Sequence, residues 1–181
     1  MLCSVITRSA LVATVIMAVP AAYAGHEDFH ASFSGFKEVG ALNSETGAIF
    51  SPGKGRLRLR VDRTNHMISF NLTYSGLSSP VTQAHIHFGK VHVPGGVLVY
   101  FCSNLPNPPA GTQACPANGG TVSGTISAAN VLAIAGQNVT AGDFVALEDA
   151  IESETTYGNI HTTNFPAGEI RGEIRKGEED D

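Results

Sequence analysis

The feature that most constrains the fold is a strictly alternating segment near the middle of the first half of the chain. Between Gly55 and Val61, three apolar residues alternate with three arginines. Successive side chains of a β-strand point to opposite faces, so this pattern predicts a strand with one buried and one solvent-exposed face. The alternation returns from Ile68 to Tyr74 after a polar turn, which predicts a hairpin.

Similar short segments recur along the chain, and the composition agrees with them. The sequence contains 20 Gly and 9 Pro, and only 15% of its residues are charged, so turns are plentiful and long charged helices scarce. We expect further strands over 29–36, 81–88, 97–102, 121–126, 157–162 and 169–175. The prediction is an all-β fold, an antiparallel β-sandwich or Greek-key-like barrel.

One segment, 127–154, breaks the alternation. Phe144, Leu147 and Ile151 recur there at helical spacing, and Thr140 with Asp143 three residues later resembles a capping box. We therefore expect a short helical insertion, with a turn or two near 128–135 and a main helix near 143–152.

Charged residues on the strands have predicted orientations. In the last strand, Ile170 and Ile174 are expected to enter the core, while residues 169, 171, 173 and 175 face water. The turn before it needs Gly168 for a left-handed conformation. The outward arginines of 55–61 are expected to pair with Glu169 and Glu173 across strands, with an anionic partner as the alternative.

The N-terminus predicts export. Arg8, an apolar run over 10–19 and the small residues of Ala22-Tyr23-Ala24 form a secretory signal over 1–24, cleaved after Ala24. The apolar run is too short for a span of about 20 residues, so we expect no membrane span in the mature protein. Residues 25–176 would form one domain, secreted or periplasmic, and 177–181 an acidic disordered tail. With 11 basic against 16 acidic residues, a nucleic-acid partner is not expected.

Two cysteines remain after cleavage. An even count in an exported chain predicts a disulfide between Cys102 and Cys115, closing a loop rich in Pro, Asn and Gly. Such a bridge contributes about 3 kcal/mol. The alternative, a thiolate metal or redox site, lacks a Cys-x-x-Cys pair.

The histidines offer a candidate metal site. His85 and His87 are two apart on a predicted strand, so both imidazoles point away from the core face. His161 follows Ile160, so if Ile160 is buried its ring also points away from the core. It would complete a set of three if the two strands are neighbours, and His92 is a weaker fourth candidate. Copper or zinc suits such ligands. The alternative is polar surface or structural hydrogen bonding.

Signals for catalysis are absent from the sequence. It has no Gly-x-Ser-x-Gly elbow, Walker loop or Rossmann fingerprint. The His-x-His pair resembles those of superoxide dismutases and cupins, but the further ligands of those sites are not found. We expect no enzyme and no cofactor, with a copper or zinc ion as the alternative.

Two longer stretches resemble the CHRD (chordin) domain family, in its single-domain bacterial form. They are Gln83-Ala84-His85-Ile86-His87-Phe88-Gly89 and Tyr157-Gly158-Asn159-Ile160-His161-Thr162, the latter followed by Pro166-Ala167-Gly168-Glu169-Ile170-Arg171-Gly172. The resemblance implies a β-sandwich-like domain of secreted or periplasmic proteins, not an enzyme, and His85, His87 and His161 match motif positions. Gly158 stands where the family often has Val and is expected to loosen its strand.

We therefore expect an extracytoplasmic, non-catalytic binding or structural module. Its partner would be an extracellular or periplasmic protein or a matrix component. The alternative is a copper- or zinc-binding protein that uses the histidines.

Overall fold

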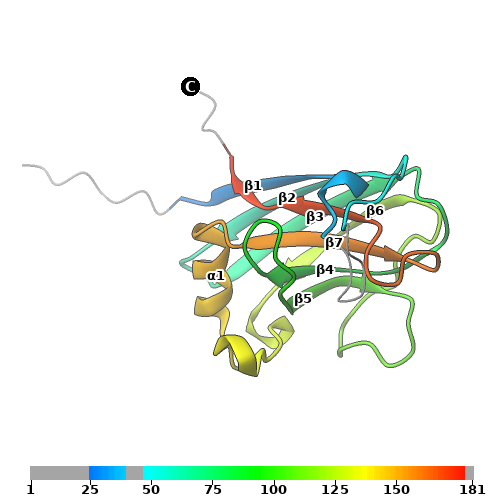
Figure 1. The fold of residues 1–181 in the computed structure, drawn as a ribbon. Coiled ribbons are helices and arrows are strands. Elements are labelled where there is room, and N and C mark those ends of the chain that lie inside the picture. The colour runs from blue at the N-terminus through cyan, green and yellow to red at the C-terminus, as the bar shows by residue number, and fades with distance from the viewer. Residues whose placement is uncertain (1–24, 40–46, 178–181) are drawn as a thin grey trace, which may run out of the picture.

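Two antiparallel sheets packed face to face make up the computed structural model, which describes residues 25–39 and 47–177 (Figure 1). The five-stranded sheet has the order β6 (Gly120–Ile126), β3 (Met67–Ser75), β2 (Lys54–Asp62), β1 (Glu27–Phe33), β9 (Arg175–Lys176). The four-stranded sheet has the order β5 (Gly96–Ser103), β4 (Val81–Phe88), β7 (Thr156–Thr162), β8 (Ile170–Glu173). The predicted all-β sandwich is confirmed, and the sheets stay open rather than closing into a barrel.

The helical segments all lie where the alternation is lost. They are the short 3-10 turns η1 (Gly35–Lys37), η2 (Ala128–Asn130) and η3 (Ala135–Gln137), and the helix α1 (Phe144–Glu152). The predicted insertion is therefore confirmed. The turn η1 was not expected: the sequence predicts a first strand that reaches residue 36, but this strand ends at Phe33.

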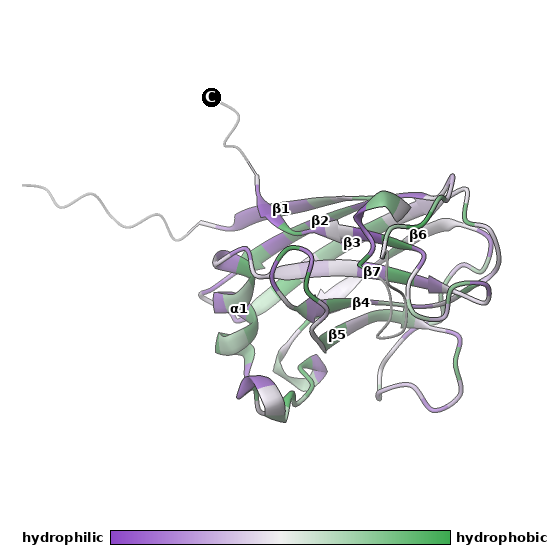
Figure 2. Cartoon of the chain, viewed as in Figure 1, coloured by the Kyte–Doolittle hydropathy of each residue, from purple (hydrophilic) through white to green (hydrophobic). Residues whose placement is uncertain are grey.

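The β2–β3 hairpin forms as the alternation predicts. Leu57 pairs with Leu72 and Leu59 with Phe70, and all four side chains are buried between the sheets. Burying such a side chain contributes about 1.5–3 kcal/mol. Apart from Met67, the outward positions are polar, so hydrophilic and hydrophobic residues alternate along these strands in Figure 2.

Apolar side chains from both sheets meet in a single core. Phe70 of β3 lies 4.9 Å, ring centroid to centroid, from Phe101 of β5, which joins the two layers. Leu147 and Ile151 of α1 are buried in the same cluster, as their helical spacing predicts. The amphipathic helix therefore closes one end of the sandwich rather than standing apart from it.

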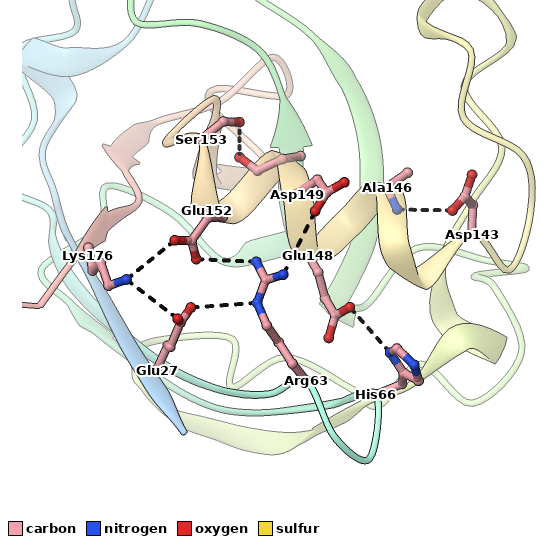
Figure 3. A network of polar contacts seen from close by, with 11 residues as sticks. Glu27, Arg63, His66, Asp143, Ala146, Glu148, Asp149, Glu152, Ser153 and Lys176 are labelled. Atoms are coloured by element: carbon pink, nitrogen blue, oxygen red, sulfur yellow. Dashed lines mark hydrogen bonds and ion pairs between the residues drawn. The ribbon is translucent and has the colours of Figure 1, made fainter. Parts of the chain in front are cut away.

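The helix starts three residues later than the predicted capping box implies. Asp143, not Thr140, is the N-cap, and its side chain accepts a hydrogen bond from the backbone N–H of Ala146. Arg63, in the β2–β3 turn, donates to Glu152 of the helix. Figure 3 shows this network, in which Glu27 and Lys176 also take part and tie α1 to β1 and β9.

The predicted last strand is divided between the two sheets. Residues 170–173 form β8 in the four-stranded sheet, and 175–176 form β9 beside β1. Ile170 and Ile174 are buried as predicted. The expectation that Glu169 and Arg171 face water was wrong, because both are 0% exposed. Irregular segments of the chain cover this side of the sheet.

The expected ion pairs across strands are also wrong. Arg56, Arg58 and Arg60 lie on β2 of one sheet, whereas the expected acidic partners belong to the chain around β8 of the other. Arg60 pairs instead with Asp28 of β1, its neighbour across the strands.

The disulfide between Cys102 and Cys115 is present. It joins β5 to the segment before β6, as the cysteine count predicts. The predicted signal at 1–24 and the acidic residues 178–181 lie outside the described residues. The described residues include no helix with the length and hydrophobicity that a transmembrane span requires.

Candidate metal centre

Three histidines from two neighbouring strands converge on one point. His85 and His87 come from β4 and His161 from β7, which pair antiparallel. Each offers a ring nitrogen, and these atoms all lie within 4.8 Å of one another. The condition left open by the sequence, that the two strands be neighbours, is therefore met. The role of the three histidines as metal ligands stays a prediction.

The strand register explains why these side chains meet. His161 pairs with Gln83, and His85 pairs with Asn159, so the histidines are close neighbours on the face opposite Ala84 and Ile86. Register shifts between β4 and β5 fall beside both His85 and His87. Such bulges re-aim side chains next to functional sites.

Backbone carbonyls fix the orientation of two of the rings. The Nδ1 of His87 lies 2.9 Å from the Gly95 carbonyl, and the Nδ1 of His161 lies 2.9 Å from the Pro166 carbonyl. A carbonyl only accepts, so in each ring Nδ1 carries the proton and Nε2 keeps its lone pair. A metal-ligating histidine typically donates its second ring nitrogen to a carbonyl in this way.

The remaining ring nitrogens are poorly satisfied. Because Nε2 of His87 keeps its lone pair, it accepts the hydrogen bond that Nδ1 of His85 donates across 2.9 Å. The Nε2 atoms of His85 and His161 are buried and have no hydrogen-bond partner. A buried polar atom without a partner costs about 1–3 kcal/mol, and a ligand that accepts these nitrogen lone pairs would offset that cost.

Burial keeps the imidazoles neutral. It lowers the pKa of His87 to about 4, and it lowers the pKa of His85 and of His161 below the usual value as well. The neighbouring histidines lower the pKa of His85 further. At neutral pH all three rings are therefore in the deprotonated form that binds metals.

An aromatic and a cation hold His87 in place. Tyr157 stacks on the His87 ring with the centroids 4.7 Å apart and the planes 2° from parallel. The Arg171 guanidinium lies 3.4 Å from the centre of the Tyr157 ring and donates to the carbonyls of Lys90 and Val93. The tyrosine hydroxyl accepts from the backbone N–H of Gly95. These contacts fix the β4–β5 loop over the cluster.

Two buried carboxylates support the same side of the sheet. Glu169 accepts hydrogen bonds from Ser51, from Thr162 and from both the backbone and the hydroxyl of Ser78. Burial alone would raise the pKa of this carboxyl, but the four hydrogen bonds lower it below its usual value. They anchor the turn that carries the carbonyl to which His161 donates.

Glu38 is the second buried carboxylate, and it behaves oppositely. It accepts from the side chain of Asn159, and burial raises its pKa to about 7. Sequence reasoning missed the buried roles of this residue, Glu169 and Arg171. A signal for the last two was present, because both belong to the closing motif that also contains His161.

The structure does not bring His92 to the cluster. This residue is exposed on the β4–β5 loop, with a left-handed φ of 63°. The group of converging ligand atoms found among the described residues contains the other three histidines and not this one. The weaker fourth candidate therefore lies outside the site.

Two glycines beside the cluster are explained by close approaches and by backbone conformation. A Cβ on Gly158 would collide with the ring of Phe33, so the aromatic fills the space of the missing side chain. Gly158 lies in β7, which is buried throughout, and the expectation that it loosens this strand stays a prediction. Gly168 has φ 128°, which confirms the predicted turn.

The family follows from the same residues. The model of the CHRD domain matches residues 29–174, which include both strands of the histidine cluster and the closing turn. The chain belongs to the CHRD domain family. CHRD is an extracellular-type domain and, in general terms, a binding or structural module, and the disulfide fits such a location. Comparison with curated proteins and with solved structures gave no match.

Proposed function

We propose that this CHRD domain is a non-catalytic, extracytoplasmic binding module whose three-histidine cluster binds one copper or zinc ion. The carrying observation is the pair of buried Nε2 atoms, on His85 and His161, that have no hydrogen-bond partner. They lie beside the imidazole of His87, whose Nδ1 donates to the Gly95 carbonyl. A metal ion is the ligand that satisfies several lone pairs at once.

The donor set favours copper or zinc over other ions. Neutral imidazole suits these metals, whereas calcium and magnesium prefer oxygen ligands. The group of converging ligand atoms among the described residues contains no carboxylate and no thiolate. Three protein ligands leave a further coordination position for water or another small ligand.

The surroundings support a binding role rather than turnover. His85 and His161 are 2% and 6% exposed, and the loop held by Arg171 lies against the third ring. A substrate would have to displace this loop to reach the ion. Export is supported by the family and by the disulfide.

The test compares metal content and metal titration in three proteins purified without an affinity tag or chelator. Wild type and His92→Ala are expected to hold one copper or zinc ion per chain, and His87→Ala/His161→Ala none. His92→Ala is the matched control because it removes an exposed imidazole close to the cluster in sequence. Thermal melts check that the double variant is folded.

Wild-type protein that is metal-free and stays empty on titration would overturn the metal site. The module would then bind through its loops, and its partner would be sought among extracellular or periplasmic proteins and matrix components.

A further inference from the structure

A row of basic side chains runs along the outer face of the five-stranded sheet. Lys54, Arg56, Arg58 and Arg60 alternate with buried residues on β2, and all four are exposed. Side chains two apart on a strand are separated by about 7 Å. The row therefore presents four positive charges in a line, on a chain whose formal net charge is −5.

Three of these charges have no acidic partner in residues 25–39 and 47–177. Arg60 pairs with Asp28, but no ion pair forms at Lys54, Arg56 or Arg58 within these ranges. The acidic residues expected to neutralise the row lie on the other sheet. The positive potential of the row is therefore largely uncompensated by the described part of the fold.

The neighbouring strands add polar groups on both sides of the row. Arg56 lies between Ser32 of β1 and Thr73 of β3, and Arg58 lies between His30 and Asn71. All of these flanking side chains are exposed. The face thus combines a central line of cations with lateral hydroxyl and amide groups.

The row lies in a shallow groove. A hollow of 960 Å³ contains Arg56, Arg58 and Arg60, and a second hollow of 360 Å³ contains Lys54 and Arg56. The two hollows share Ser32 and Arg56, so the groove continues along β2 past all four cations.

We propose that this groove binds a linear acidic polysaccharide. Carboxylate or sulfate groups repeated along such a chain match a line of cations, and sugar hydroxyls match the flanking Ser, Thr and Asn side chains. Among the side chains that point outward from β1, β2 and β3 at this row, the one aromatic ring that could stack on a base is the imidazole of His30. These side chains include no large apolar group that would insert into a membrane.

The groove and the histidine cluster belong to different sheets. Polysaccharide binding therefore does not depend on the metal site, and either proposal can fail without the other.

The test measures binding of the protein to immobilised polygalacturonate and to a sulfated polysaccharide, with neutral dextran as the control ligand. Arg58→Glu and Lys90→Glu each change the net charge by the same amount. Lys90 is exposed on the loop that follows β4 in the other sheet. We expect Arg58→Glu to weaken binding at least about tenfold and Lys90→Glu to change it less than about twofold.

A second variant guards against misfolding. Arg56→Gln/Arg58→Gln keeps the face polar, and it should also weaken binding while its melting temperature stays near that of wild type. The inference is overturned if the acidic polysaccharides bind no better than dextran, or if the two charge reversals have equal effects. Preferential binding of single-stranded DNA or of vesicles containing phosphatidylglycerol would equally overturn it.

Discussion

The two sheets of this sandwich differ in how far their outer faces are buried. On β2 of the five-stranded sheet, every second residue from Lys54 to Arg60 is an exposed cationic side chain. On β7 of the four-stranded sheet, all seven residues are buried, although polar and apolar residues are mixed there as well. Alternation thus identifies which side of a strand meets the apolar core. It does not tell whether the other side meets water.

Burial makes the polar groups of the four-stranded sheet dependent on partners. Glu169 receives four hydrogen bonds, and Arg171 is held by backbone carbonyls and the face of Tyr157. On the exposed sheet water supplies such partners, so its arginines remain available to an external ligand. Within the buried layer four side-chain atoms lack a hydrogen-bond partner: Nε2 of His85, Nε2 of His161, Oγ1 of Thr156 and Nε of Arg171. The two imidazole nitrogens belong to one cluster.

The largest expected effect is the difference in stability between two variants, each of which loses one arginine from a different sheet. Arg171→Met removes a fully buried cation that lies 3.6 Å from Glu173 and holds the β4–β5 loop. We expect it to lower the free energy of unfolding by about 3–5 kcal/mol. Arg58→Met, on the exposed face, should change it by about 0.5 kcal/mol or less. Urea unfolding measures both, and equal effects would contradict the distinction between the sheets.

The next largest effect concerns β5, at the edge of the four-stranded sheet. Replacing Cys102 and Cys115 by Ala removes the crosslink that holds the loop between them. We expect a loss of about 3 kcal/mol in the free energy of unfolding, because the unfolded chain regains the entropy of the open loop. Reducing the wild type should lower its melting temperature similarly. Melts that coincide with and without the bridge would refute this.

The buried carboxylate of Glu38 should make the free energy of unfolding depend on pH. The pKa of Glu38 is raised to about 7 by burial, from 4.5. The native state therefore binds the proton more tightly than the unfolded state, and this contribution to stability is lost as the pH rises from about 4.5 to 7. As the pH rises from 4.5 to 8, the free energy of unfolding of Glu38→Gln should increase by about 2–3 kcal/mol relative to that of wild type. A difference that is constant over this range would show that the carboxylate is not strained by burial.

The buried histidines should have the opposite effect, making the protein less stable as the pH falls. Their pKa values are lowered, to about 4 for His87, so the unfolded state binds protons more readily between that pH and 6.5. This part of the stability is present above pH 6.5 and is lost as the pH falls. In acid melts His87→Phe should show a shallower decline than wild type, whereas His92→Phe should follow the wild type.

Much of the fold could be predicted because local patterns determine it. The hairpin of β2 and β3 and the buried face of α1 follow from spacing, and the bridge of Cys102 to Cys115 follows from the cysteine count. The convergence of the histidines needed one fact beyond spacing, the pairing of β4 with β7. Pairing of distant strands depends on the whole topology, which alternation does not encode.

The buried side of the site could not be predicted in the same way. Glu169 and Arg171 alternate with apolar residues in the same way as exposed residues would, and they are buried because loops fold over them. Those loops have no periodicity from which their position could be inferred. Gly158 shows the same limit, since the residue that explains it, Phe33, is far away in sequence.

X-ray absorption spectroscopy on copper- or zinc-loaded protein tests the central claim most directly, because it reports the atoms around the ion. The account predicts one ion per chain with three imidazole nitrogens at about 2.0–2.1 Å, in wild type and in His92→Ala alike. The His87→Ala/His161→Ala variant should give no such signal. An ion surrounded mainly by oxygen atoms, or the same imidazole shell in the double variant, would contradict a metal centre at His85, His87 and His161.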